Sequence, residues 1–173
     1  NGEKIQLPFD QIQNPALIKD YTILKKNCYI LDIAFDKRNR PMVLTISSKG
    51  YQPGPENDPR SWEFFHYDGN KWNNTELTTC ENLKKDLQEV CRIFYEYYSN
   101  YDMGSVYSDN DLIRIIAPTE KGPQVYNPGG EIAVWESDDN GISWKLKRQL
   151  TVGSTKNHTY VRSPKNCHPD FYA

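Results

Sequence analysis

The segment Ser137–Trp144 (SDDNGISW) constrains the fold more than any other part of this sequence. It follows the pattern S-x-D-x-G-x-S-W, set by Ser137, Asp139, Gly141, Ser143 and Trp144. An aspartate at this place can accept hydrogen bonds from the backbone N–H groups of a tight turn. Gly141 can adopt a positive φ, and Trp144 can fold back as an apolar plug. The segment therefore predicts a stabilised turn between two strands, with a structural rather than a chemical role.

Three further segments repeat one pattern along the chain. They begin at Asn27, Asn100 and Asn157, and each continues with a strand-like run, a polar turn and a second strand-like run. The turns are Asp36–Arg40, Ser108–Asp111 and Ser163–Asn166. Runs of β-forming residues on both sides of such turns predict a hairpin in each segment.

A second pair of strands follows each of the first two hairpins. Trp62–Tyr67 leads into the turn Asp68–Trp72, which resembles a degenerate copy of SDDNGISW, and Glu131–Glu136 leads into SDDNGISW itself. Each unit then holds about four strands, which is the composition of one β-propeller blade. The sequence therefore predicts an all-β, partial β-propeller of two to three antiparallel blades.

The predicted organisation is a single partial propeller domain over residues 1–173. Residues 1–26 are either the end of a preceding blade or a lead-in segment. Residues 27–80 and 100–156 form blades, and residues 157–173 begin the next blade. Glu81–Ser99 interrupts this series, with apolar residues at helical spacing, and predicts an inserted amphipathic helix. This helix either packs on the rim of its blade or acts as a lid or a partner-binding helix.

Composition excludes some function classes. The formal net charge is -2, so no basic stripe suggests nucleic acid, and no apolar run reaches membrane-spanning length. Aromatic residues make up 13% of the chain, and exposed aromatics often line sugar-binding surfaces.

Metal and disulfide signals are weak. The cysteines, Cys28, Cys80, Cys91 and Cys167, form no CxxC pair, so we expect no cofactor and no catalytic metal, and leave a structural divalent metal and the redox state open.

His158, Tyr160 and Arg162 are the candidate catalytic residues. They occupy alternate positions, so on a strand all three side chains would point to one face. Arg162 could neutralise the carboxylate of a uronate, and His158 could remove the adjacent proton. Tyr160 could protonate the leaving oxygen or share the role of base. These roles describe β-elimination by a polysaccharide lyase. The competing interpretation is structural, with each side chain satisfied by neighbouring blades.

Four more residues are candidates for substrate binding: Tyr101, Asp102, Glu120 and Glu131. A glycosidase would need two of the carboxylates as a pair, but their spacing selects none. A sialidase-like hydrolase would need three arginines, and only Arg162, with Arg60 or Arg114 as weaker candidates, is available. His66, between Phe65 and Tyr67, is interpreted as structural.

Several short motifs occur together in a recognisable order. They are Asp32–Asp36, Arg40-Pro41, Asn100–Ser105, Ile116–Glu120, Gly129–Glu131, SDDNGISW and Asn157–Arg162. In this order they resemble the BNR-repeat (Asp-box) family of secreted bacterial β-propellers, whose relatives include ulvan lyases and rhamnose–glucuronate lyases.

The resemblance implies a seven-bladed parent, of which this chain would be a fragment, and uronate-directed lyase chemistry by His158, Tyr160 and Arg162. It also implies a secreted, periplasmic or cell-surface location and a polysaccharide or oligosaccharide partner. A non-catalytic glycan-binding propeller remains the alternative. The open sheet edges of a fragment further predict self-association.

Overall fold

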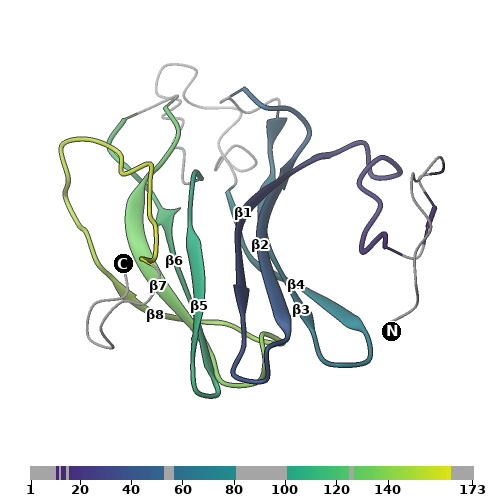
Figure 1. The fold of residues 1–173 in the computed structure, drawn as a ribbon. Helices are drawn as coiled ribbons and strands as arrows, with labels where there is room; N and C mark the ends of the chain where they lie inside the picture. Colours follow the sequence, from purple (N-terminus) through teal and green to yellow (C-terminus); the bar gives the residue numbers. More distant parts are fainter. Residues whose placement is uncertain are drawn as a thin grey trace.

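The described part of the chain is built from two antiparallel sheets. The computed structural model describes residues 11, 13–14, 16–52, 57–80, 101–124 and 127–164. The first sheet contains, in spatial order, β1 (Asn27–Phe35), β2 (Pro41–Ser48), β3 (Arg60–Tyr67) and β4 (Trp72–Cys80). The second contains β5 (Ser105–Asp109), β6 (Leu112–Glu120), β7 (Glu131–Ser137) and β8 (Lys145–Gln149). Each sheet is a meander of sequential strands (Figure 1). The all-β prediction is confirmed, as are the strand pairs predicted for the first two units.

Polar turns close the hairpins where the sequence predicts them. In the β1–β2 turn, Asp36 Oδ1 accepts hydrogen bonds from the N–H groups of Arg38 and Arg40, at 2.9 and 2.8 Å. Asn39 and Asn110 adopt φ values of 59° and 57° in the β1–β2 and β5–β6 turns. Asparagine tolerates this left-handed region better than most residues, which explains its position in both turns.

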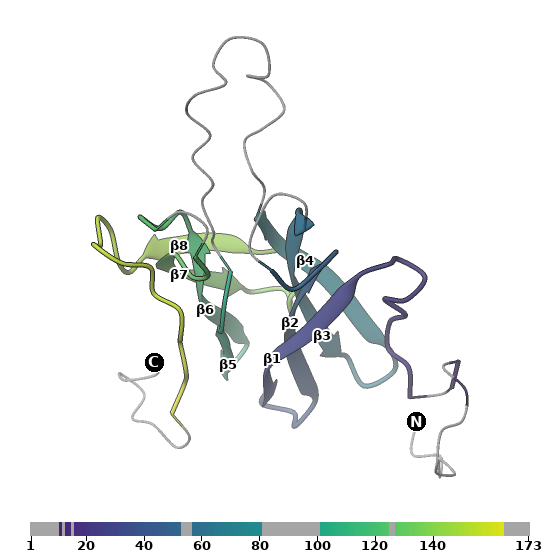
Figure 2. The same ribbon diagram turned by 90° about the horizontal axis from the view of Figure 1, so that it is seen from above.

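The two sheets pack against each other through one apolar core. Its fully buried members include Leu44, Trp62, Phe64 and Ile115. Strands β1 and β5 lie side by side (Figures 1 and 2). Asp32 Oδ2 of β1 accepts a hydrogen bond of 2.9 Å from the Val106 N–H of β5. The alternation of apolar residues in β2 and β6 places Leu44 and Ile115 on this shared face.

The far face of the second sheet is covered by the third repeat. Val161 packs against Ile116 and Val134 in a second apolar cluster. This segment is predicted to begin a strand, but in the structure it makes two isolated bridges, His158 with Gly130 and Tyr160 with Met103. The rest of the repeat, residues 165–173, lies outside the described residues, as does the helix predicted for Glu81–Ser99.

The far face of the first sheet is covered only in part by the described residues. The segment before β1 contributes Lys19, whose ammonium pairs with the buried carboxylate of Glu63. Beyond this contact, Ile30, Ile33 and Phe35 of β1 are each more than half exposed. This apolar strip lies next to the free edge of β1, which has β2 as its only partner strand among the described residues.

Candidate functional site

The Ser137–Trp144 turn is organised around the carboxylate of Asp139. Its Oδ1 accepts bonds from Ser137 Oγ and from the N–H groups of Ile142 and Ser143, and Oδ2 accepts one from Ser143 Oγ. Burial acts to raise the pKa of Asp139, but these hydrogen bonds outweigh it and hold the pKa at about 2. Asp139 is thus engaged inside its own turn.

The same turn also contacts the other sheet. Trp144 packs edge-on against Phe64 of β3, with ring centroids 5.0 Å apart, and Thr75 Oγ1 donates a 2.6 Å bond to the Gly141 carbonyl. His66 is buried, with one ring nitrogen 3.2 Å from the Asn140 carbonyl and the other 3.0 Å from Asp36 Oδ2. The structural interpretation of His66 therefore agrees with its contacts.

Asp68 repeats the arrangement of Asp139 at the β3–β4 turn. Its Oδ1 accepts bonds from the N–H groups of Asn70 and Lys71, at 2.8 and 2.9 Å. These backbone bonds, together with one from Asn73, lower its pKa to about 2. The interpretation of this turn as a degenerate copy of SDDNGISW is consistent with the shared geometry.

Asn157 anchors the third repeat to the loop between β6 and β7. Its backbone N–H donates to Gln124 Oε1, its Oδ1 accepts from the Gln124 N–H, and its Nδ2 donates to the carbonyls of Gln124, Asn127 and Pro128. These bonds fix the point from which the backbone runs through His158, Tyr160 and Arg162.

His158 is joined to a carboxylate through a serine. Its Nε2 lies 2.9 Å from Ser154 Oγ, which donates a 2.9 Å bond to Oε2 of the buried Glu131. Since the serine proton goes to Glu131, His158 Nε2 must be the donor to Ser154. Burial acts to raise the pKa of Glu131, but bonds from Thr151 and Ser154 lower it overall. Glu131 and His158 therefore hold the loop between β8 and the third repeat.

Tyr160 and Arg162 form a separate pair. The guanidinium lies 5.0 Å from the centre of the Tyr160 ring, and its Nη1 donates a 2.6 Å bond to the Leu31 carbonyl of β1. Met103 Sδ lies 4.0 Å from Nη2. Arg162 thus connects the third repeat to the first sheet, next to a cavity that Leu31 and Met103 help to line.

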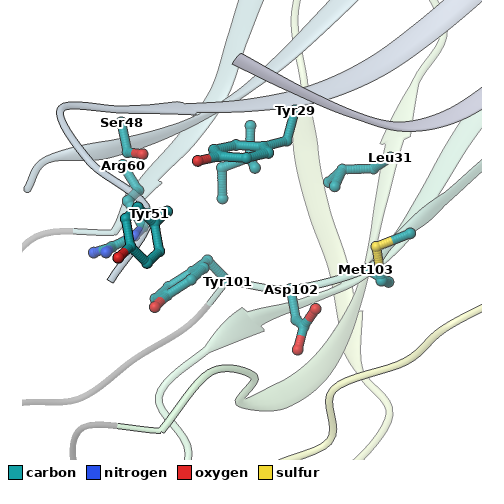
Figure 3. Close-up of a pocket in the computed structure, with 9 residues that line it drawn as sticks. Tyr29, Leu31, Ser48, Tyr51, Arg60, Tyr101, Asp102 and Met103 are labelled. Carbon is teal, nitrogen blue, oxygen red and sulfur yellow. The ribbon is translucent and has the colours of Figure 1, made fainter. Parts of the chain in front are cut away.

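This cavity, of about 210 Å³, lies between β1, the loop after β2 and residues 101–103. Three tyrosines from separate parts of the chain surround it: Tyr29, Tyr51 and Tyr101 (Figure 3). Tyr29 and Tyr51 keep 41% and 73% of their surface exposed, so their rings are accessible from solvent. The remaining lining residues are Leu31, Ile46, Ser48, Arg60, Asp102 and Met103.

Arg60 is a buried residue in the wall of the cavity. Its guanidinium stacks on Tyr101 at 4.0 Å from the ring centre and pairs with Asp58 Oδ1 at 2.7 Å, and only 1% of the residue is exposed. On sequence grounds Arg60 is only a weak candidate for a sialidase arginine, and no sequence motif points to Tyr29 or Tyr51. The surplus of tyrosine, 12 in 173 residues, was the available signal, but it does not say which rings meet.

Asp102 differs from the aspartates in the turns. Burial raises its pKa, and a hydrogen bond from the Met103 N–H offsets this only in part. In the described part of the chain, no lysine or arginine forms an ion pair with it. The structure thus places the predicted binding residues Tyr101 and Asp102 together at the cavity, with Arg162 nearby.

Glu120 and Glu131 face different surroundings. They are partners in the β6–β7 register, but Glu131 lines a second cavity of about 270 Å³ together with Ser154 and Lys121. Arg114 forms ion pairs with Glu136 and Asp109. These contacts give no support for a cluster of Arg114 with Arg60 and Arg162, which a sialidase-like site would need.

Clusters of metal-ligating side chains and helices that could span a membrane are both absent from the described residues. No cluster of three or more His, Cys, Asp or Glu side chains in that part of the chain is arranged to hold a metal ion. No helix described there is long and apolar enough to cross a membrane. Cys28 and Cys80 are free thiols.

Compared with models of known families, with curated proteins and with solved structures, the chain gives no match.

Proposed function

We propose that the two sheets are neighbouring blades of a β-propeller and that the tyrosine-lined cavity binds an oligosaccharide. Support for the blades comes from three features: the four-stranded meanders, the face-to-face apolar core and the adjacent first strands, β1 and β5. The third repeat covers the next face, as the start of another blade would. We also propose that the protein acts outside the cytoplasm, where extracellular glycans are found.

The observation that carries the binding proposal is the convergence of Tyr29, Tyr51 and Tyr101 beside Asp102. Sugar rings present apolar C–H faces that pack on aromatic rings, and hydroxyl groups that donate to carboxylates and phenols. Tyr51 and Tyr29 offer accessible ring faces, and Asp102 offers an acceptor. This arrangement accounts for binding without assigning chemistry to His158.

Binding is tested in two steps. A glycan array identifies oligosaccharides that the chain binds, and titration of the chain with those oligosaccharides gives their dissociation constants. Tyr51→Ala removes one exposed ring and should raise the dissociation constant about tenfold, which corresponds to a loss of roughly 1.4 kcal/mol in binding free energy. Ile23→Ala is the matched control, because Ile23 has the same 73% exposure and is not among the cavity residues. Equal affinity of the Tyr51→Ala protein and the control would reject the cavity as the site.

A polysaccharide lyase is the second candidate, favoured by the pairing of Tyr160 and Arg162 next to the cavity. Arg162 would neutralise a uronate carboxylate, and Tyr160 or His158 would remove the proton from the carbon bearing it. The bond to the leaving sugar oxygen then breaks, that oxygen takes a proton, and a carbon–carbon double bond forms.

The lyase is tested by ultraviolet absorbance of the unsaturated product with uronate polymers. Arg162→Lys retains the charge but loses the planar fork, so it should reduce turnover strongly if the guanidinium holds the carboxylate. His158→Ala distinguishes a structural role of the imidazole from a role as the base. Loss of turnover in a variant that still folds would assign His158 as the base. Absence of product with every uronate polymer would leave glycan binding as the proposed function.

A further inference from the structure

Three charged residues lie at or next to the tyrosine-lined cavity, and they differ in whether a neighbouring group balances their charge. Arg60 is almost fully buried and is paired with Asp58 at 2.7 Å, so its charge is offset inside the protein. Arg162 donates to the Leu31 carbonyl and stacks on Tyr160, which directs its guanidinium to the strand and ring rather than to a carboxylate. Asp102 lines the cavity with no ion-pair partner among the described residues.

The tyrosines add a second electrostatic feature of the same sign. The face of an aromatic ring is the negative end of its quadrupole and attracts cations. Tyr101 already shows this property, since the Arg60 guanidinium lies 4.0 Å from its ring centre. No cation of the described residues stacks on Tyr29 or Tyr51, and both are partly exposed. Their faces are therefore accessible to a cation from outside.

We propose that the cavity takes a positively charged amine of its ligand, held against the faces of Tyr29 and Tyr51 and balanced by Asp102. This inference rests on the proposed glycan binding and specifies it: the preferred glycan carries free, protonated amino groups, as a de-N-acetylated hexosamine polymer does. An ammonium group supplies the counter-charge that Asp102 lacks. A carboxylate at the same place would meet both Asp102 and the negative ring faces.

The test compares four oligosaccharides of equal length, titrated calorimetrically into the complete chain. They are a glucosamine oligomer, its fully N-acetylated form, a neutral glucose oligomer and a uronate oligomer. The pH is chosen so that the amine is protonated and Asp102 is ionised. We expect the glucosamine oligomer to bind about tenfold more tightly than the N-acetylated form, which is within the range of desolvated cation–π contacts.

Variants assign that preference to its residues. Asp102→Asn conserves shape but removes the negative charge that balances the amine, so it should reduce the preference for the glucosamine oligomer to about threefold or less. Asp138→Asn removes the same charge from an aspartate in the β7–β8 turn whose side chain is 70% exposed, and should leave the preference intact. Tetramethylammonium, which offers only a cation, should compete with the glucosamine oligomer. Circular dichroism spectra confirm that each variant is folded.

The four titrations test the preference for an amine separately from glycan binding itself. Equal binding of the amine, N-acetylated and neutral oligomers would overturn the cation proposal and retain glycan binding. Preference for the uronate oligomer would overturn it in favour of the lyase candidate. Failure of all four to bind would overturn both proposals.

Discussion

At the scale of single residues, Gly141 shows how closely the Ser137–Trp144 turn fits the neighbouring sheet. Its φ is +83°, and an added Cβ would lie 2.2 Å from the Phe64 ring. Gly141→Ala should therefore reduce the free energy of unfolding by about 3 kcal/mol, through backbone strain and the clash together. Chemical denaturation measures this change.

Gly153→Ala is the control for that substitution. Gly153 also has a positive φ, +68°, but a Cβ there would meet no atom within 4 Å. The expected loss is about 1 kcal/mol, from backbone strain alone. Equal losses at both positions would contradict the close approach of Gly141 to Phe64.

The turn aspartates predict acid sensitivity. Asp36, Asp68 and Asp139 each have a pKa of about 2 in the folded chain, against an ordinary value of 3.8. A lowered folded-state pKa gives stability that is complete above the unfolded value and is lost as the pH falls through the folded value. The free energy of unfolding should therefore decrease between about pH 4 and pH 2, as measured by denaturation across that range. Asp139→Asn should flatten part of this dependence, and an unchanged profile would contradict the assignment.

At the scale of elements, the β7–β8 hairpin couples the two sheets through Trp144 and Phe64. Edge-to-face aromatic pairs contribute about 1 kcal/mol beyond the area they bury. A double-mutant cycle with Phe64→Leu and Trp144→Leu should thus give a coupling energy of about 1 kcal/mol in unfolding. Strictly additive losses would show that the rings act independently.

At the scale of the whole molecule, the apolar strip of Ile30, Ile33 and Phe35 beside the free edge of β1 favours association. Self-association through open sheet edges stays a prediction, and sedimentation velocity at several concentrations tests it. Ile33→Lys should shift the chain toward the monomer. Ile142→Lys, at another exposed isoleucine, should not. A monomer at all concentrations would contradict the prediction.

The turns and strand faces could be predicted from the sequence because they depend on interactions between residues that are close in the chain. The hairpin turns at Asp36, Asp68 and Asp139 are held by carboxylate bonds to backbone N–H groups no more than four residues away. Alternating apolar residues likewise set the faces of β2 and β6. These patterns predicted the strands, their pairing and the structural role of the Ser137–Trp144 turn.

Only the tertiary structure decided which side chains meet at the cavity. Tyr29, Tyr51 and Tyr101 come from different segments, and the partner of Arg162 is a carbonyl 131 residues away. Alternation along a strand predicted that His158 would share a face with Tyr160 and Arg162, but not that Ser154 and the buried Glu131 would engage its ring. The spacing of residues determines the direction of a side chain, whereas its partners depend on how separate elements pack.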